Sequence, residues 1–195
     1  MYQYLSAPVA GLALLAPVAG VALFAAIAAT PAEAQDATAF QGPRVEATVG
    51  LDQLRFDLSN IGGAGRDKAS DIGYGFALGY DKAVAPKLLI GVEGGMNFSD
   101  VSYADDALRS RREFDVSGRI GTPITHNTLL YGKIGYSNLQ VRELDQTRNL
   151  DGLLLAAGAE VKVSPIVYLK SEYRYATYGD GYSTNGVLTG VGVRF

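Results

Sequence analysis

Apolar and polar residues alternate one by one in eight stretches of the chain after residue 43. The clearest stretch is 71–81, where bulky apolar side chains at every second position from Ile72 to Tyr80 alternate with glycine, alanine and aspartate. A period of two is typical of a β-strand with two different faces. The predicted strands are 44–58, 71–81, 88–98, 113–122, 128–141, 152–163, 166–178 and 186–195. The alternation of apolar and polar residues shifts by one position at Gln53 and Leu54, which predicts a β-bulge in the first strand.

Alternation alone also fits a soluble β-sandwich, but three further features favour a membrane barrel. The strands have about ten residues, enough to cross the ~25 Å apolar band of an outer membrane when tilted. Small residues, such as Gly73, Gly75 and Gly79, share the face that carries the charges. This suits a narrow lumen filled by long side chains. The last strand ends on the aromatic Phe195. We therefore predict an all-β fold, an eight-stranded antiparallel transmembrane β-barrel.

The predicted connections differ in length in a regular order. Those near 59–70, 99–112, 142–151 and 179–185 are long, and those near 82–87, 123–127 and 163–165 are short and contain proline. Long outer loops and short periplasmic turns are typical of outer-membrane barrels. We expect the protein in the bacterial outer membrane, with both termini in the periplasm.

The N-terminus predicts a cleavable, helical signal peptide over residues 1–34. Residues 7–29 carry no charge, and Ala32 and Ala34 fit the pattern that signal peptidase reads, with cleavage before Gln35. A retained transmembrane anchor is the alternative, because the apolar stretch is long enough to span a bilayer. The first eight residues contain no lysine or arginine, so the true start codon could lie elsewhere. Residues 35–42 are then a periplasmic linker, and residues 43–195 form the barrel.

The overall composition excludes several classes of protein. With 48% hydrophobic and 19% charged residues, the chain is too polar for a bundle of transmembrane helices, whereas a β-barrel alternates polar and apolar positions. The net charge of -3 gives no basic excess, so no nucleic-acid partner is expected. The chain has no cysteine, which rules out disulfides, thiol catalysis and thiolate metal sites.

Charged residues on the predicted inner faces form the candidate functional site. They are Glu93, Arg119, Lys133, Glu160, Lys170, Glu172 and Arg174. Unpaired charges in a lumen without bulk water would each cost several kcal/mol. We therefore predict a salt-bridge network that plugs the barrel, and the alternative is a small water-filled pore lined by the same residues.

No catalytic, cofactor-binding or metal site is predicted, and we expect that the protein is not an enzyme. The single histidine, His126, falls in a short turn at the predicted periplasmic end, away from the outer end where some barrel enzymes have their sites. Asp105, Asp106 and the basic run 109–112 could bind a divalent cation and lipopolysaccharide phosphates, or could be a solvated loop.

Several short motifs resemble one family. They are GPRVE (42–46), GYG to GYD (73–81), YGKIGY (131–136), EYRY (172–175) and GVGVRF (190–195). With these motifs the chain resembles the outer-membrane protein β-barrel domain family, the OmpA-like and opacity-type porin-family proteins of Gram-negative bacteria. The resemblance covers about residues 40–195 and implies architecture more than chemistry.

The resemblance also implies partners. In the family the barrel-assembly machinery reads the terminal strand, and Val191, Val193 and Phe195 look like that signal. Outer-membrane lipids and lipopolysaccharide are the other expected partners, and a monomer is expected. The predicted role is structural and surface interaction in the envelope; the alternative is a narrow passive porin-like channel for small solutes.

Overall fold

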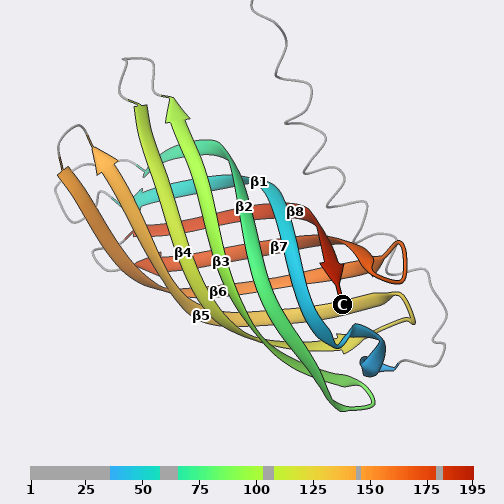
Figure 1. Ribbon diagram of the computed structural model, residues 1–195. Coiled ribbons are helices and arrows are strands. Elements are labelled where there is room, and N and C mark those ends of the chain that lie inside the picture. The colour runs from blue at the N-terminus through green and yellow to red at the C-terminus, as the bar shows by residue number, and fades with distance from the viewer. Residues whose placement is uncertain (1–35, 58–65, 103–107, 144–145, 179–181) are drawn as a thin grey trace, which may run out of the picture.

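The computed structural model describes residues 36–57, 66–102, 108–143, 146–178 and 182–195. Its strands are β1 (Gly42–Asp57), β2 (Arg66–Ala85), β3 (Leu88–Ser102), β4 (Leu108–Pro123), β5 (Thr128–Glu143), β6 (Gln146–Lys162), β7 (Val167–Tyr178) and β8 (Tyr182–Arg194). Each strand pairs antiparallel with the next, and β8 pairs with β1, so the sheet closes into a barrel (Figure 1). The predicted eight-stranded antiparallel barrel is confirmed.

Most strands are longer than predicted, and only β7 is one residue shorter. β2 has 20 residues and begins at Arg66, five residues before the alternating stretch. The pairing of β3 with β4 likewise continues out to Ser102 and Leu108, and this hairpin projects well beyond the neighbouring strands in Figure 1. Alternation is required only where one face meets lipid. A sequence pattern therefore misses the parts of a hairpin that extend beyond the membrane.

The bulge predicted at Gln53 and Leu54 is wrong. The register between β1 and β2 runs without interruption from Gly42 opposite Asp81 to Asp57 opposite Arg66. The shift occurs instead in β2 between Ala83 and Ala85, opposite Leu88 and Leu89 of β3. The parity change in β1 is therefore not a change of pairing, and it falls where the strand leaves the alternating band.

The two faces of the barrel are inverted relative to those of a soluble protein. In β4, Arg119 is 4% exposed whereas Val116 is 67% exposed. The same order holds in β2, where Leu78 is exposed and Asp81 is buried. Apolar side chains face outward, as lipid requires, and charged side chains fill the interior.

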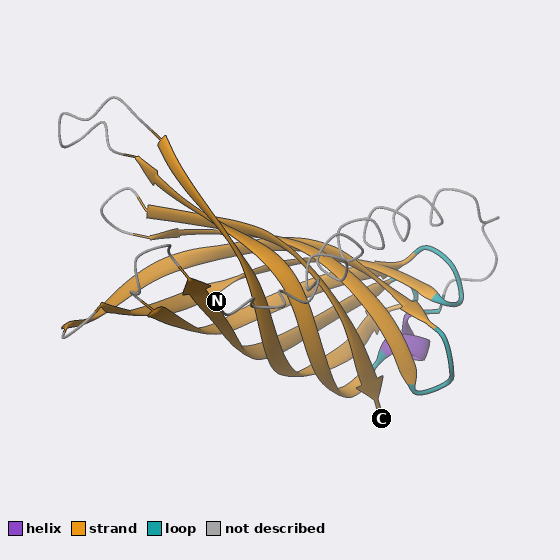
Figure 2. Ribbon diagram, turned by 90° about the horizontal axis from the view of Figure 1, so that it is seen from above, coloured by secondary structure: helices purple, strands orange, loops and turns teal. Residues whose placement is uncertain are grey.

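One end of the barrel holds the short turns, the C-terminus and a one-turn 3₁₀ helix, η1 (Ala37–Phe40) (Figure 2). We call it the termini end and the opposite end the hairpin end. Asp36 caps η1 by accepting a hydrogen bond from the Thr38 amide, and this contact holds the pKa of the Asp36 carboxyl below its ordinary value. Residues expected to form a linker are thus partly folded against the barrel. Among the described residues, no helix is long and apolar enough to cross a membrane.

Candidate functional site

The lumen holds thirteen buried charged side chains among the described residues. All seven of the residues predicted from sequence are there, and each makes at least one ion pair. Six more were missed: Arg44, Glu46, Asp81, Glu113, Asp115 and Arg194. Glu113 and Asp115 alternate in step with the predicted Arg119 on β4, and the other four lie on β1, β2 and β8, strands from which no network member was predicted. All six lie within the predicted strand ranges, so the alternation of those strands is enough to place them on the inner face.

Six of these side chains form a closed ring in which positive and negative charges alternate. In order around this six-residue ring they are Arg44, Glu93, Lys133, Glu172, Lys170 and Glu46. The N···O distances around the ring are 2.5–3.4 Å. Every member therefore has an oppositely charged neighbour on both sides, which offsets much of the cost of burying it.

A second, four-residue ring lies nearer the termini end. Its members are Asp81, Arg119, Glu160 and Arg194, with N···O distances of 2.7–3.5 Å. Arg44 joins the two rings through a 3.0 Å contact with Asp81. The ten residues of the two rings comprise five cations and five anions, so the combined network has no net charge.

The two rings draw on alternate strands. The six-residue ring comes from β1, β3, β5 and β7, whereas the four-residue ring comes from β2, β4, β6 and β8. Inward side chains of neighbouring strands in a tilted barrel lie at different heights, so alternate strands fill separate layers. The network is thus a product of barrel geometry as well as of residue type.

A smaller group of charges lies toward the hairpin end. Arg174 contacts Glu113 at 2.6 Å and Asp115 at 3.6 Å. Ser137 donates a 2.6 Å hydrogen bond to Glu113, and Asn97 donates one of 3.2 Å to Asp115. This group has one cation for two carboxylates, and neutral donors supply part of the compensation.

Tyrosines complete the network between and beside the rings. The Tyr131 hydroxyl donates to Glu172 at 2.8 Å, while the Arg119 guanidinium lies 4.0 Å from the centre of the Tyr131 ring. Tyr131 therefore contacts both rings. Tyr168 donates a 2.6 Å hydrogen bond to Glu46, and Arg194 lies over its ring at 4.8 Å.

Inward glycines provide the space for these side chains. A Cβ added at Gly79 would lie 2.6 Å from the Arg44 guanidinium, and one at Gly95 would lie 2.6 Å from the Asp115 carboxylate. At Gly91 an added Cβ would overlap the Asp81 carboxylate. The interpretation of the glycine-lined face as a narrow, filled lumen agrees with these contacts.

Two clusters of buried apolar side chains lie on either side of the charges in the lumen. At the termini end, Phe40 of η1 is fully buried with Leu89 and Leu129, and the Lys162 ammonium lies 4.4 Å from its ring centre. At the hairpin end, a second apolar cluster contains Leu139, Leu154, Ala176 and Tyr178. Neither cluster is visible in the sequence, because isolated leucines on a polar face, and a phenylalanine outside any alternating stretch, give no periodic signal.

Comparison with known protein families matches residues 22–195 to the outer membrane protein beta-barrel domain. The chain belongs to this family. Its location in the bacterial outer membrane follows, and the family resemblance read from the motifs is confirmed.

Two outer membrane β-barrel relatives are similar in sequence. The 22 kDa outer membrane protein of Rhizobium leguminosarum is 28% identical over 162 residues, which cover 69% of this chain and 76% of that protein. The 25 kDa outer-membrane immunogenic protein of Brucella ovis is 26% identical over 114 residues, covering 56% of this chain and 57% of that protein.

Two solved outer membrane β-barrels share the fold. Ail, the attachment invasion locus protein of Yersinia pestis, solved with the heparin analogue sucrose octasulfate, has a TM-score of 0.58 at 18% identity. The match covers 79% of this chain and 99% of Ail. Neisserial surface protein A has a TM-score of 0.57 at 17% identity, covering 79% of this chain and 97% of that one.

The remaining predicted site residues lie away from the network. His126 is exposed in the turn between β4 and β5, at the termini end. Val191 and Phe195 are exposed on the outer face of β8 and at the end of the chain. The cleavage residues Ala32, Ala34 and Gln35, and the side chains of the loop residues Asp105 and Asp106, lie outside the described residues. Within the described residues, no group of three His, Cys, Asp or Glu side chains is arranged to hold a metal ion.

Proposed function

We propose that this outer-membrane barrel is a structural and surface-interaction protein with a closed lumen, rather than a channel or an enzyme. Its hairpin end faces outside the cell and its termini end faces the periplasm. The long projecting hairpins at one end and the short turns at the other support this orientation. Val191, Val193 and Phe195 keep their proposed role as the signal for the assembly machinery, which acts on a monomer.

The stack of layers in the lumen carries this proposal. From the termini end inward come the Phe40 cluster, the four-residue ring, the six-residue ring, the Arg174 group and the Leu139 cluster. The cavity between the six-residue ring and the Arg174 group is about 10 Å³, which holds about one water molecule. Hydrated ions need a continuous water path, and two apolar seals oppose one.

Surface interaction is proposed because the hairpins are the parts that such a barrel presents to its surroundings. Attachment, in the name of Ail, is a property of that protein. Here the shared fold supports only a similar presentation of hairpins above the membrane. A protein or polysaccharide ligand of these hairpins is to be sought by measuring binding to intact cells.

Planar-bilayer conductance tests the closed lumen. The purified chain, with folding verified by heat-modifiable gel mobility, should give no steady channels across a bilayer. A Phe40→Ala/Leu154→Ala double variant, which removes bulk from both seals, is the matched comparison and should raise the frequency of brief openings. Steady channels in the wild-type chain would contradict the proposal and would favour the narrow porin-like channel.

Cysteine labelling tests the orientation, since the natural chain contains no cysteine. His126→Cys lies in an exposed turn at the termini end, and Asn149→Cys lies at an exposed position toward the hairpin end. On intact cells, a membrane-impermeant maleimide should label Asn149→Cys and not His126→Cys. The reverse pattern would refute the proposed orientation.

A further inference from the structure

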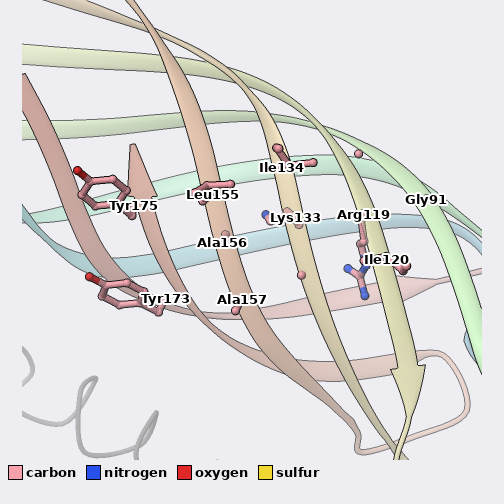
Figure 3. Close-up of a pocket in the computed structure, with 12 residues that line it drawn as sticks. Gly91, Arg119, Ile120, Lys133, Ile134, Leu155, Ala156, Ala157, Tyr173 and Tyr175 are labelled. Carbon is pink, nitrogen blue, oxygen red and sulfur yellow. The ribbon is translucent and has the colours of Figure 1, made fainter. Parts of the chain in front are cut away.

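The lipid-facing surface of the barrel is hollowed over β4 to β7 (Figure 3). The hollow has a volume of about 670 Å³. Its outward-facing small residues are Gly118, Gly132 and Ala157, and bulky side chains such as Ile134 and Leu155 border it. In Figure 3 the Leu155, Tyr173 and Tyr175 side chains stand on neighbouring strands around the depression. We call it the outer groove.

Barrel packing does not require glycine in the outer groove. A Cβ added at Gly118 or Gly132 would have its nearest neighbour at 3.9 or 3.8 Å, which is ordinary contact or open space. The inward glycines differ, because a Cβ at Gly79 or Gly95 would collide with a buried charged side chain. Outward glycine also lowers strand propensity. The hollow is therefore a feature of the outer surface and not a by-product of filling the lumen.

The shape of the groove fits one extended hydrocarbon chain. One row of paired residues runs from Ile120 through Gly132 and Ala157 to Tyr173, across four strands. Three strand spacings amount to about 14 Å, comparable with a fatty acyl chain. Because this surface faces membrane hydrocarbon, an acyl chain is the occupant that the surroundings supply.

The two ends of the groove differ in chemistry. Tyr173 and Tyr175 form the β7 end, and Tyr175 lies three residues before the strand ends at the hairpin end. Ile120 forms the β4 end, three residues before that strand ends at the termini end. Tyrosine favours the boundary between hydrocarbon and polar headgroups. An acyl chain bound in the groove would therefore enter from the leaflet at the hairpin end.

A polar surface lies on the hairpin side of the groove, on the outer face of the same strands. Asp151 accepts hydrogen bonds from the Tyr136 hydroxyl at 2.5 Å and from the Asn138 amide at 2.6 Å. Farther along, Gln140 accepts from the Arg112 guanidinium at 2.9 Å and donates to Asn149 at 3.1 Å. These exposed amide, carboxylate and guanidinium groups suit sugar hydroxyls, sugar amides and a phosphate. We call this set the polar rim.

We propose that the outer groove binds one acyl chain of a phosphorylated glycolipid of the lipopolysaccharide type, with its sugar headgroup on the polar rim. This rests on the proposed orientation, which puts the hairpin end at the outer leaflet. Apolar contact in the groove supplies affinity, and the hydrogen bonds of the rim distinguish a sugar headgroup from the small headgroup of phosphatidylethanolamine.

Native mass spectrometry of the full barrel tests the proposal, with rough lipopolysaccharide and phosphatidylethanolamine as the added lipids. Gly132→Leu fills the groove from outside without entering the lumen. Gly94→Leu is the matched control, because Gly94 also faces outward, has its nearest neighbour for an added Cβ at 3.9 Å, and does not line the groove. Both variants should fold, as verified by heat-modifiable mobility.

The wild-type chain and Gly94→Leu should each retain one lipopolysaccharide molecule. Gly132→Leu should bind it about tenfold more weakly, the equivalent of losing about two buried methylene contacts. Asp151→Ala tests the rim separately and should reduce lipopolysaccharide retention without changing phosphatidylethanolamine retention. Equal retention by Gly132→Leu and wild type, or equal retention of both lipids by wild type, would overturn the proposal.

Three other outcomes are equally decisive. A wild-type dimer that becomes a monomer in Gly132→Leu, with lipopolysaccharide binding unchanged, would assign the groove to a second copy of the chain. If lipid retention fails while cysteine labelling and conductance behave as expected, only the groove assignment falls. If His126→Cys is labelled on intact cells, the orientation and hence the proposed function falls with it.

Discussion

Replacing Arg44 by methionine should destabilise the barrel more than any single change on its outer surface. The Arg44 side chain is fully buried and contacts three carboxylates, Glu46 at 2.5 Å, Glu93 at 2.6 Å and Asp81 at 3.0 Å. One such pair is worth about 4 kcal/mol at an effective dielectric constant of ~20 and ~4 Å between charges. Burying the guanidinium cancels several kcal/mol of the total.

The net loss of stability on removing Arg44 depends on the cations that its three carboxylate partners still contact. Each of the three still has another cation, since Lys170 contacts Glu46, Lys133 contacts Glu93, and Arg194 contacts Asp81. Without Arg44, however, the two rings are no longer neutral and carry one excess negative charge. Removing one partner of a buried ion pair costs about 3–5 kcal/mol, and we expect Arg44→Met to fall in this range.

Urea unfolding in lipid vesicles, followed by heat-modifiable gel mobility, measures this loss without tryptophan, which the chain lacks. Lys82→Met, at an exposed position on β2, is the control and should change stability by less than about 0.5 kcal/mol. Adding Glu93→Gln to Arg44→Met restores neutrality and should recover about 1–3 kcal/mol through their coupling.

Either of two results would refute the stabilising role of the two charge rings. Arg44→Met could unfold at the urea concentration of the wild type, which would mean that the rings add nothing to stability. Alternatively, the double variant could be less stable than Arg44→Met by the full cost of Glu93→Gln alone, which would mean that the charges do not interact.

Two further predictions concern the termini end and the packing of the lumen. Phe40→Ala removes a fully buried ring and should cost about 3–5 kcal/mol in the same urea assay; an unchanged midpoint would show that the packing of η1 against the barrel adds nothing to stability. Gly91→Ala places a Cβ on the Asp81 carboxylate and should cost about 1–3 kcal/mol. Gly94→Ala, on the open outer face, should be neutral, and equal effects of the two alanines would contradict the difference drawn between inner and outer glycines.

The alternation of inward and outward positions along each strand accounts for most of what the sequence predicts here. Because inward and outward positions alternate strictly, residues such as Lys133 and Glu172 could be placed in the lumen before any contact was known. Their partners could not, because an ion pair such as Arg194 with Glu160 depends on strand tilt and register across the closed barrel. The same alternation gave a wrong bulge at Gln53, where the regular alternation of β1 ends although its pairing with β2 continues.

The ends of the lumen were beyond sequence reasoning for a different reason. Phe40 precedes the first strand in a stretch with no periodicity, and its burial depends on Leu89 and Leu129, which are distant in sequence. Leu139 and Leu154 lie on faces that are otherwise polar. Single apolar residues in such positions become informative only when the barrel brings them together.

The assignment of the two rings to alternate strands has a consequence for assembly. Until β8 is in place the four-residue ring lacks Arg194, so Asp81 and Glu160 share only the remaining cations. The ring from the odd-numbered strands likewise needs β7, which supplies Lys170 and Glu172, to close back onto β1. A sheet that has not closed therefore carries uncompensated charge toward hydrocarbon. The four-residue ring is complete only when β8 is in place, so the interior charges favour the closed barrel over a sheet of seven strands.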